Sequence, residues 1–204
     1  DNEPMVHYYL YALTNDKSEL DKAENSDSLY CFPNRLEDIA VLEKAIYNGG
    51  NYAAYYLGCL FYDKGRWEES KELWEKCADN ITLPTVYRNL SLVYYNKLKD
   101  GVLALKAMEK AFSIDKSDAR IFFELDQLYK TLNFSLEKRL ANMNENSDLL
   151  EKRDDLYTEY ITLLNMNGEY DNAYNRIMNH NFHPWEGGEG KIPAQYRIAL
   201  INKA

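Results

Sequence analysis

Residues 55–79 read "YYLGCLFYDKGRWEESKELWEKCAD", and their pattern returns in residues 88–113, "RNLSLVYYNKLKDGVLALKAMEKAFS". Apolar, aromatic and small positions fall into register: Leu57 matches Leu90, Phe61 matches Tyr94, Ser70 matches Ala104, Trp74 matches Met108 and Cys77 matches Ala111. Weaker copies follow at 123–140 and 158–178, and Ser70, Ala104, Lys138 and Ala173 are spaced by 34, 34 and 35 residues. A period of about 34 residues predicts a repeat architecture.

The repeat resembles the tetratricopeptide repeat (TPR), a family in which each unit is a pair of antiparallel helices. Residues 55–79 supply the family's pattern in order, with Leu57-Gly58, an aromatic at Phe61, a turn glycine at Gly65 and a small residue at Ser70. Small residues are needed where two helices cross closely, since helix axes there lie about 8–10 Å apart. The resemblance implies an all-α, right-handed TPR-like solenoid of about four to five antiparallel helix pairs, in which units stack because none buries its apolar stripe alone.

The chain divides into four expected parts. Residues 1–34 hold a partial first helix, including Met5 to Leu13, and a linker into the array. Residues 35–180 hold the helical repeats, and 181–192 form a Gly-rich loop. A terminal or capping helix spans 193–204, where Pro193 suits a first helical turn.

The third repeat departs from the family pattern in an informative way. Asp126 replaces the expected glycine, and Lys138 stands at the small position of the facing helix. An unpaired buried charge is costly, so we expect these two side chains to form an ion pair across the seam. The alternative is an open repeat in which both charges reach water.

A second resemblance rests on "YCFPNRLEDIAVLEKAI" (30–46), "FELDQLYKTL" (123–132) and "NFHPWEGGEGKIPAQY" (181–196). These segments are similar to the C-terminal TPR region of large bacterial proteins. Those proteins carry an uncharacterised, carbohydrate-associated β-sandwich domain upstream. The resemblance implies no catalytic residue in this part of the chain.

Composition excludes several classes of function. The net charge of −9 argues against nucleic acid, because phosphate binding requires clustered Lys and Arg. No apolar run approaches the roughly 20 residues of a membrane span, and the acidic helices do not favour a membrane surface. Cys31, Cys59 and Cys77 have neither disulfide-framework nor metal-site spacing, so we expect reduced core thiols in a cytoplasmic protein.

The concave groove of such an array is formed mainly by the first helix of each repeat, and it is the expected binding face. Tyr and Arg are favoured at interfaces because one end packs and the other forms hydrogen bonds. The register places the following candidates in the groove: Tyr52, Tyr55, Tyr62, Arg88, Asn89, Tyr95, Arg120, Phe123, Glu124 and Gln127. The alternative is a solvated face with some aromatic rings tucked into neighbouring repeats.

The segment "HNFHPWEGGEG" (180–190) does not have a helical pattern. We expect a recognition loop in which His183, Trp185, Glu186 and Glu189 contact a ligand, while the glycines permit unusual backbone angles. His180 stands at a small-residue position of the fourth repeat's second helix and is expected to pack there. The alternatives are a metal site, a carboxylate pair acting on a sugar, and a mere connection anchored by Phe182 and Trp185.

The sequence therefore predicts a non-catalytic interaction or docking scaffold without cofactor or metal. Its expected partner is a protein segment or an upstream domain of the same protein, and possibly carbohydrate, but neither nucleic acid nor membrane. The competing hypothesis is an accessory part of a carbohydrate-active protein, in which the Trp-Glu-Gly-Gly-Glu-Gly loop contributes to a sugar-binding or hydrolytic site.

Overall fold

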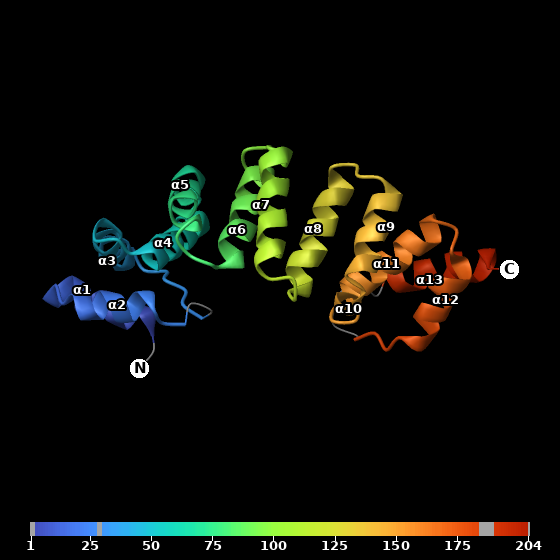
Figure 1. The fold of residues 1–204 in the computed structure, drawn as a ribbon, viewed down its shortest axis with the longest axis horizontal. Coiled ribbons are helices and arrows are strands. Elements are labelled where there is room, and N and C mark those ends of the chain that lie inside the picture. Colours follow the sequence, from blue (N-terminus) through green and yellow to red (C-terminus); the bar gives the residue numbers. More distant parts are fainter. Residues whose placement is uncertain (1–2, 28–29, 184–189, 204) are drawn as a thin grey trace. The chain divides into compact units, whose positions relative to one another are not determined.

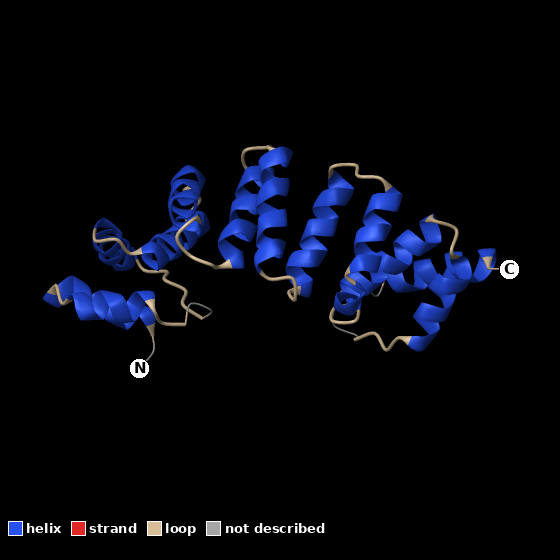
Figure 2. Ribbon diagram, viewed as in Figure 1, coloured by secondary structure: helices blue, strands red, loops and turns tan. Residues whose placement is uncertain are grey.

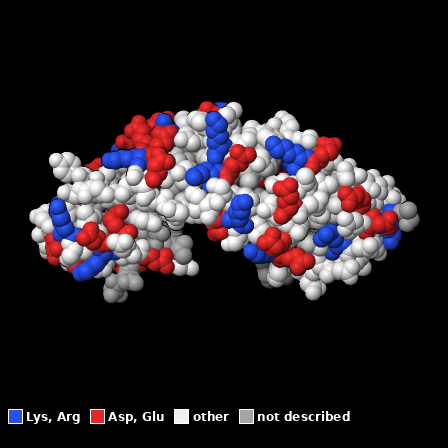
Figure 3. Space-filling model, viewed as in Figure 1, with Lys and Arg blue, Asp and Glu red and all other residues white. Residues whose placement is uncertain are grey.

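The computed structural model describes residues 3–27, 30–183 and 190–203, and all regular secondary structure in these ranges is helical (Figures 1 and 2). The chain divides into two compact units, residues 1–114 and 115–204. On the face drawn in Figure 3, acidic and basic side chains are interspersed. No described helix has the length and apolar composition needed to cross a bilayer.

The first unit is a succession of helices, most of them joined by short turns, with a longer connection, residues 25–35, between α2 and α3. Its elements are α1 (Pro4–Thr14), α2 (Lys17–Glu24), α3 (Leu36–Tyr47), α4 (Asn51–Asp63), α5 (Trp67–Ala78), α6 (Pro84–Asn96) and α7 (Gly101–Ile114). The most extensive packing joins α6 to α7 and α4 to α5, the two helix pairs of the repeats read from the sequence. The repeat period thus corresponds to real helical hairpins.

The second unit adds α8 (Ala119–Thr131), α9 (Leu136–Glu145), the short α10 (Ser147–Leu150), α11 (Asp154–Met166), α12 (Tyr170–Asn179) and α13 (Lys191–Asn202). Gly65 after α4 and Gly168 after α11 both adopt left-handed backbone angles, with φ of 78° and 81°. A side chain is strained at such angles, so glycine is the natural residue at these two turns. The helix α13 begins at Lys191, two residues before the expected start at Pro193, which lies in its first turn.

Residues 4–24 form two helices, so α2 occupies part of the segment expected as linker. Asp16 begins α2, because its carboxylate accepts a hydrogen bond from the Ser18 N–H at 2.9 Å. Glu24 at the end of α2 then reaches the start of α4, where its carboxylate accepts N–H bonds from Asn51, Tyr52 and Ala53 at 2.8–3.0 Å. A residue distant in sequence therefore caps α4 and links α2 to the array.

Several of the 18 tyrosines join helices through their hydroxyl groups. Tyr8 donates to Glu24 at 2.6 Å, Tyr94 donates to Glu75 at 2.7 Å, and Tyr160 donates to Asn144 at 2.7 Å. Burial, together with the Glu24 carboxylate, raises the pKa of Tyr8, which keeps its hydroxyl a hydrogen-bond donor. A buried ring with a satisfied hydroxyl explains why the core tolerates so much tyrosine.

A close helix crossing lies between α4 and α5 at Gly58. A Cβ atom there would overlap Nε1 of Trp74, whose indole N–H donates to the Tyr55 carbonyl at 3.1 Å. Ser70, fully buried, donates to the Gly58 carbonyl at 2.7 Å. In the next pair, Ser91 of α6 donates to the Ala104 carbonyl of α7 at 2.8 Å. Small residues at these positions let the helix backbones approach each other.

The prediction that Asp126 pairs with Lys138 is wrong, because Asp126 pairs with Arg139 instead. Asp126, fully buried on α8, accepts two hydrogen bonds from the Arg139 guanidinium, at 3.0 and 2.7 Å. Arg139 is the fourth residue of α9, as Ser70, Ala104 and Ala173 are in α5, α7 and α12, so the register of this repeat is shifted by one residue. Lys138 is exposed, with Nζ 4.2 Å from the Phe134 ring centroid.

We predict that Arg139→Met lowers the free energy of unfolding by about 3–5 kcal/mol, because it leaves Asp126 buried without its cation. Adding Asp126→Leu removes the stranded charge and should recover much of that loss. Lys138→Met is the matched control, with an expected change of about 1 kcal/mol or less. Urea denaturation followed by circular dichroism measures all three. A larger effect of Lys138→Met than of Arg139→Met would contradict the assignment.

Candidate functional site

The predicted groove residues of the first unit lie on α4 and α6 and have similar exposure. Tyr52, Tyr55, Tyr62, Arg88, Asn89 and Tyr95 are all half-buried. Such side chains are held by neighbours yet keep part of their surface open. They form neither a fully solvated face nor a closed core.

A small hollow of about 100 Å³ brings two of these residues together with three others. Tyr62 and Asn89 line it with Cys59, Trp74 and Leu92. The Tyr62 and Trp74 rings lie 5.8 Å apart between centroids and are tilted by 36°. From the repeat register Trp74 was expected only as a packing residue, but it lines this hollow from α5.

Polar groups in this hollow are partly satisfied. The Asn89 amide donates to Sγ of Cys59 at 3.8 Å, and a thiol is a weak acceptor. Burial raises the pKa of Cys59 to about 11 and also raises the pKa of Tyr55. Both groups are therefore neutral near pH 7, so the hollow offers an amide, a thiol and aromatic surface instead of a charge.

The cysteines carry free thiols, as the sequence predicted. Burial raises the pKa of Cys31 and Cys77 to about 12 in each case. A thiolate is the nucleophilic form of cysteine, so these buried thiols are unreactive near pH 7. In the described part of the chain, His, Cys, Asp and Glu side chains form no group of three or more suited to a metal ion.

The predicted groove residues of the second unit lie on α8. Arg120 is exposed and pairs with Glu124, one helical turn further on, at 3.2 Å. Phe123 and Gln127 are half-buried. The Gln127 side-chain nitrogen is buried without a hydrogen-bond partner among the described residues. These four residues share one helix of the second unit.

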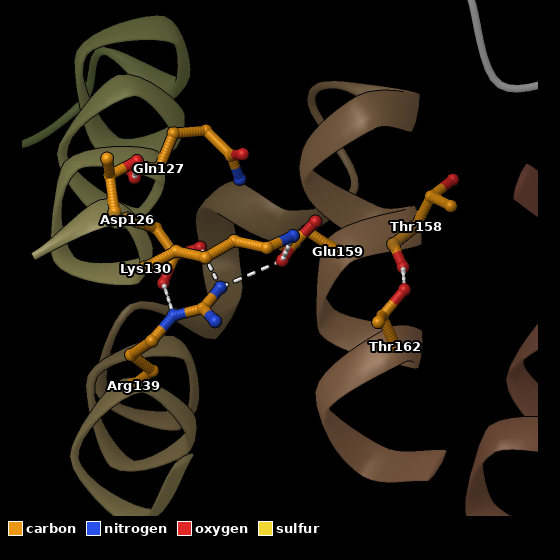
Figure 4. A network of polar contacts seen from close by, with 8 residues as sticks. Asp126, Gln127, Lys130, Arg139, Thr158, Glu159 and Thr162 are labelled. Carbon is orange, nitrogen blue, oxygen red and sulfur yellow. Dashed lines mark hydrogen bonds and ion pairs between the residues drawn. The ribbon is translucent and has the colours of Figure 1, made fainter. Parts of the chain in front are cut away.

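Beside Gln127 lies a charge network that the sequence analysis did not identify (Figure 4). Arg139 bonds Asp126 and also Glu159 of α11 at 2.8 Å, and Lys130 of α8 bonds Glu159 at 2.7 Å. Burial raises the pKa of Glu159, but hydrogen bonds from Lys130 and Arg139 outweigh it and leave that pKa lowered. Two cations and two carboxylates thus balance, which fixes α8, α9 and α11 to one another.

The start of the expected loop is fixed by Asp154 at the beginning of α11. His180 Nε2 lies 2.9 Å from one oxygen of this buried carboxylate, while the His183 N–H and Nδ1 face the other, Nδ1 at 3.3 Å. His180 was expected inside a helix, but it follows the last residue of α12 and stacks on Tyr157 with centroids 4.0 Å apart. Trp185, Glu186 and Glu189 lie outside the described residues.

Two larger hollows lie in the first unit. One, of about 640 Å³, is bordered by α1 and residues 30–35, and Val6, Leu13 and Phe32 line it with exposed apolar surface. The other, of about 460 Å³, lies between α3 and α5. Neither was anticipated from the sequence, because both depend on which helix faces are left uncovered after packing.

The Asp154 anchor predicts a pH-dependent stability. Burial raises the pKa of Asp154, yet hydrogen bonds from His180 and His183 outweigh it and lower that pKa overall. A lowered folded-state pKa stabilises the fold above the unfolded-state pKa of about 3.9, and this contribution is lost as pH falls through the folded pKa. Asp154→Asn should therefore cost about 1–3 kcal/mol at pH 7 and much less near pH 3.

Urea denaturation at the two pH values tests this, with the exposed Asp148→Asn as control. An equal cost of Asp154→Asn at both pH values would show that the carboxylate charge does not hold the segment.

Comparison with known proteins agrees with the repeat architecture. No family model matches the chain. Among solved structures, YrrB, a TPR protein with an unusual peptide-binding site, aligns with a TM-score of 0.56 at 16% identity, over 99% of this chain and 92% of its own. MamA gives 0.56 at 13% identity, over 98% and 96%. PilF of Pseudomonas aeruginosa gives 0.55 at 15% identity, over 99% and 83%. The fold is that of an all-helical TPR solenoid.

Proposed function

We propose that the chain is a non-catalytic scaffold that binds a protein segment on the face formed by its first helices. The observation that carries the proposal is the row of half-buried Tyr, Arg and Asn side chains on α4 and α6, around the hollow lined by Tyr62, Trp74 and Asn89. Rigid aromatic surface beside an amide is suited to recognition, because rings bury area at low entropic cost. That YrrB has a peptide-binding site on a similar fold supports the same use.

The side-chain amide of Asn89 is the group that we expect to bind the peptide backbone. Its amide N–H is bonded only weakly, to a thiol 3.8 Å away, so exchanging that contact for a peptide carbonyl strengthens a hydrogen bond. An apolar side chain of the same peptide would cover the rings of Tyr62 and Trp74. On the second unit, Arg120, Phe123, Glu124 and Gln127 offer a cation, a ring, a carboxylate and an amide on α8.

We further propose that the segment after α12 contributes to binding, since Asp154 holds its start at His180 and His183. The partner is a segment of another protein or a further part of the same polypeptide.

The test is selection of binders from a displayed library of random dodecapeptides, followed by fluorescence polarisation with the selected peptides. Asn89→Ala should weaken binding about five- to tenfold, as the loss of about 1 kcal/mol requires, and Tyr62→Ala should weaken it further. The exposed Glu145→Gln on α9 is the control.

Peptides that bind both variants as tightly as the parent chain, with folding intact, would overturn the proposed face, as would failure to select any binder. The sugar hypothesis makes a separate prediction: Trp185→Ala would abolish binding of oligosaccharides on a glycan array and leave peptide binding unchanged.

A further inference from the structure

The groove between α3 and α5 is distinct from the face just described. Its floor is formed by Leu57 and Phe61 of α4, which packs against both walls. The α3 wall contributes Glu43, Ile46 and Tyr47, and the α5 wall contributes Glu69, Glu72, Leu73 and Lys76. The neighbouring residues Leu73 and Trp74 line different hollows, so α5 separates this groove from the one around Asn89.

Helical spacing places these residues on one face of each wall. Glu43, Ile46 and Tyr47 are spaced by three and four residues, which lie together on a helix surface. Tyr47 is 90% exposed, and Ile46 and Leu73 are half-buried, so apolar surface remains open between the walls. A large ring held at the end of a helix with so little burial contributes little to the core.

The charges in the groove are mainly negative. Figure 3 shows acidic side chains gathered over α5. Glu69 is engaged by Arg66 and Glu75 by Lys71, whereas Glu43 and Glu72 form no hydrogen bond or ion pair with any described residue. Lys76 is the single basic residue among the groove's described lining. Glu43 and Glu72 therefore stand one on each wall without a direct ion-pair partner among the described residues. The Arg66 guanidinium, which lies over the Phe61 ring of the floor, also attracts Glu43.

We propose that this groove is a second docking site and that its occupant is a protein segment with an aliphatic side chain flanked by Lys or Arg. The aliphatic group lies between Tyr47 and Leu73 over the Phe61 floor, and the two cations face Glu43 and Glu72. Charge complementarity favours a positively charged segment, since like charges that face each other across an interface are disfavoured. The apolar floor distinguishes such a segment from a simple polycation.

The experiment measures binding of three fluorescent peptides to the full chain: acetyl-KLLKALLK-amide, its acidic match acetyl-ELLEALLE-amide, and acetyl-KSSKASSK-amide, which keeps the charge and lacks the apolar residues. The first peptide alone should bind. Its affinity should fall when salt is raised from about 50 to about 500 mM, because exposed charge pairs are screened.

Three variants assign the site. Glu43→Gln and Glu72→Gln should each weaken binding a few-fold and about tenfold together, and Tyr47→Ala should weaken it comparably. All three residues are exposed, so folding should be preserved, as circular dichroism will verify. Glu145→Gln on α9 and Asn89→Ala on α6 are controls that should leave this binding unchanged.

Each other outcome overturns the proposal. Absence of binding by acetyl-KLLKALLK-amide removes the site. If the serine peptide binds equally well, the binding is only nonspecific attraction of polycations. If the acidic peptide binds equally well, Glu43 and Glu72 do not determine which segment binds. Binding that Asn89→Ala weakens and the α3 and α5 variants do not would place the peptide on the other face, leaving the proposed function intact.

Discussion

The absence of room for a side chain at Gly58 governs how α4 and α5 pack. With Trp74 occupying the space that a Cβ would need, and Ser70 bonded to the Gly58 carbonyl, the two backbones approach at one defined point. Ser91 and Ala104 repeat the arrangement in α6 and α7. In α8 and α9 the same positions hold Asp126 and Arg139, so a bidentate ion pair replaces close backbone contact. Helix pairing is thus achieved in two chemically different ways.

The pairing also creates the surfaces that the proposals use. Because α5 inserts Trp74 on one side and Leu73 on the other, it lines both the hollow near Asn89 and the groove opposite Tyr47. The hollow near Asn89 is lined by uncharged residues, whereas the groove opposite Tyr47 is lined by several carboxylates. Two faces of α5 therefore favour segments of different charge. A scaffold built in this way could hold two partners at once.

The sequence predicted the helical repeats because glycine, small and aromatic residues recur at the period that helix crossing requires. It misassigned Lys138 because the fit to a period of 34 placed α9 one residue early, and periodicity cannot choose between adjacent basic residues. The Ser135 N-cap of α9 is the local signal that would have corrected it. Glu24, Glu159 and Asp154 were missed because their partners lie far away in the sequence, and only packing reveals which polar groups meet.

The most direct test of the close-crossing account is the stability of Gly58→Ala in two backgrounds, measured by urea denaturation. Alanine normally favours a helix over glycine by up to about 1 kcal/mol, but here its methyl group overlaps Trp74, so we expect a net loss of about 1–3 kcal/mol. In a Trp74→Leu background the same substitution should become neutral or stabilising. A stabilising Gly58→Ala in the presence of Trp74 would contradict the account.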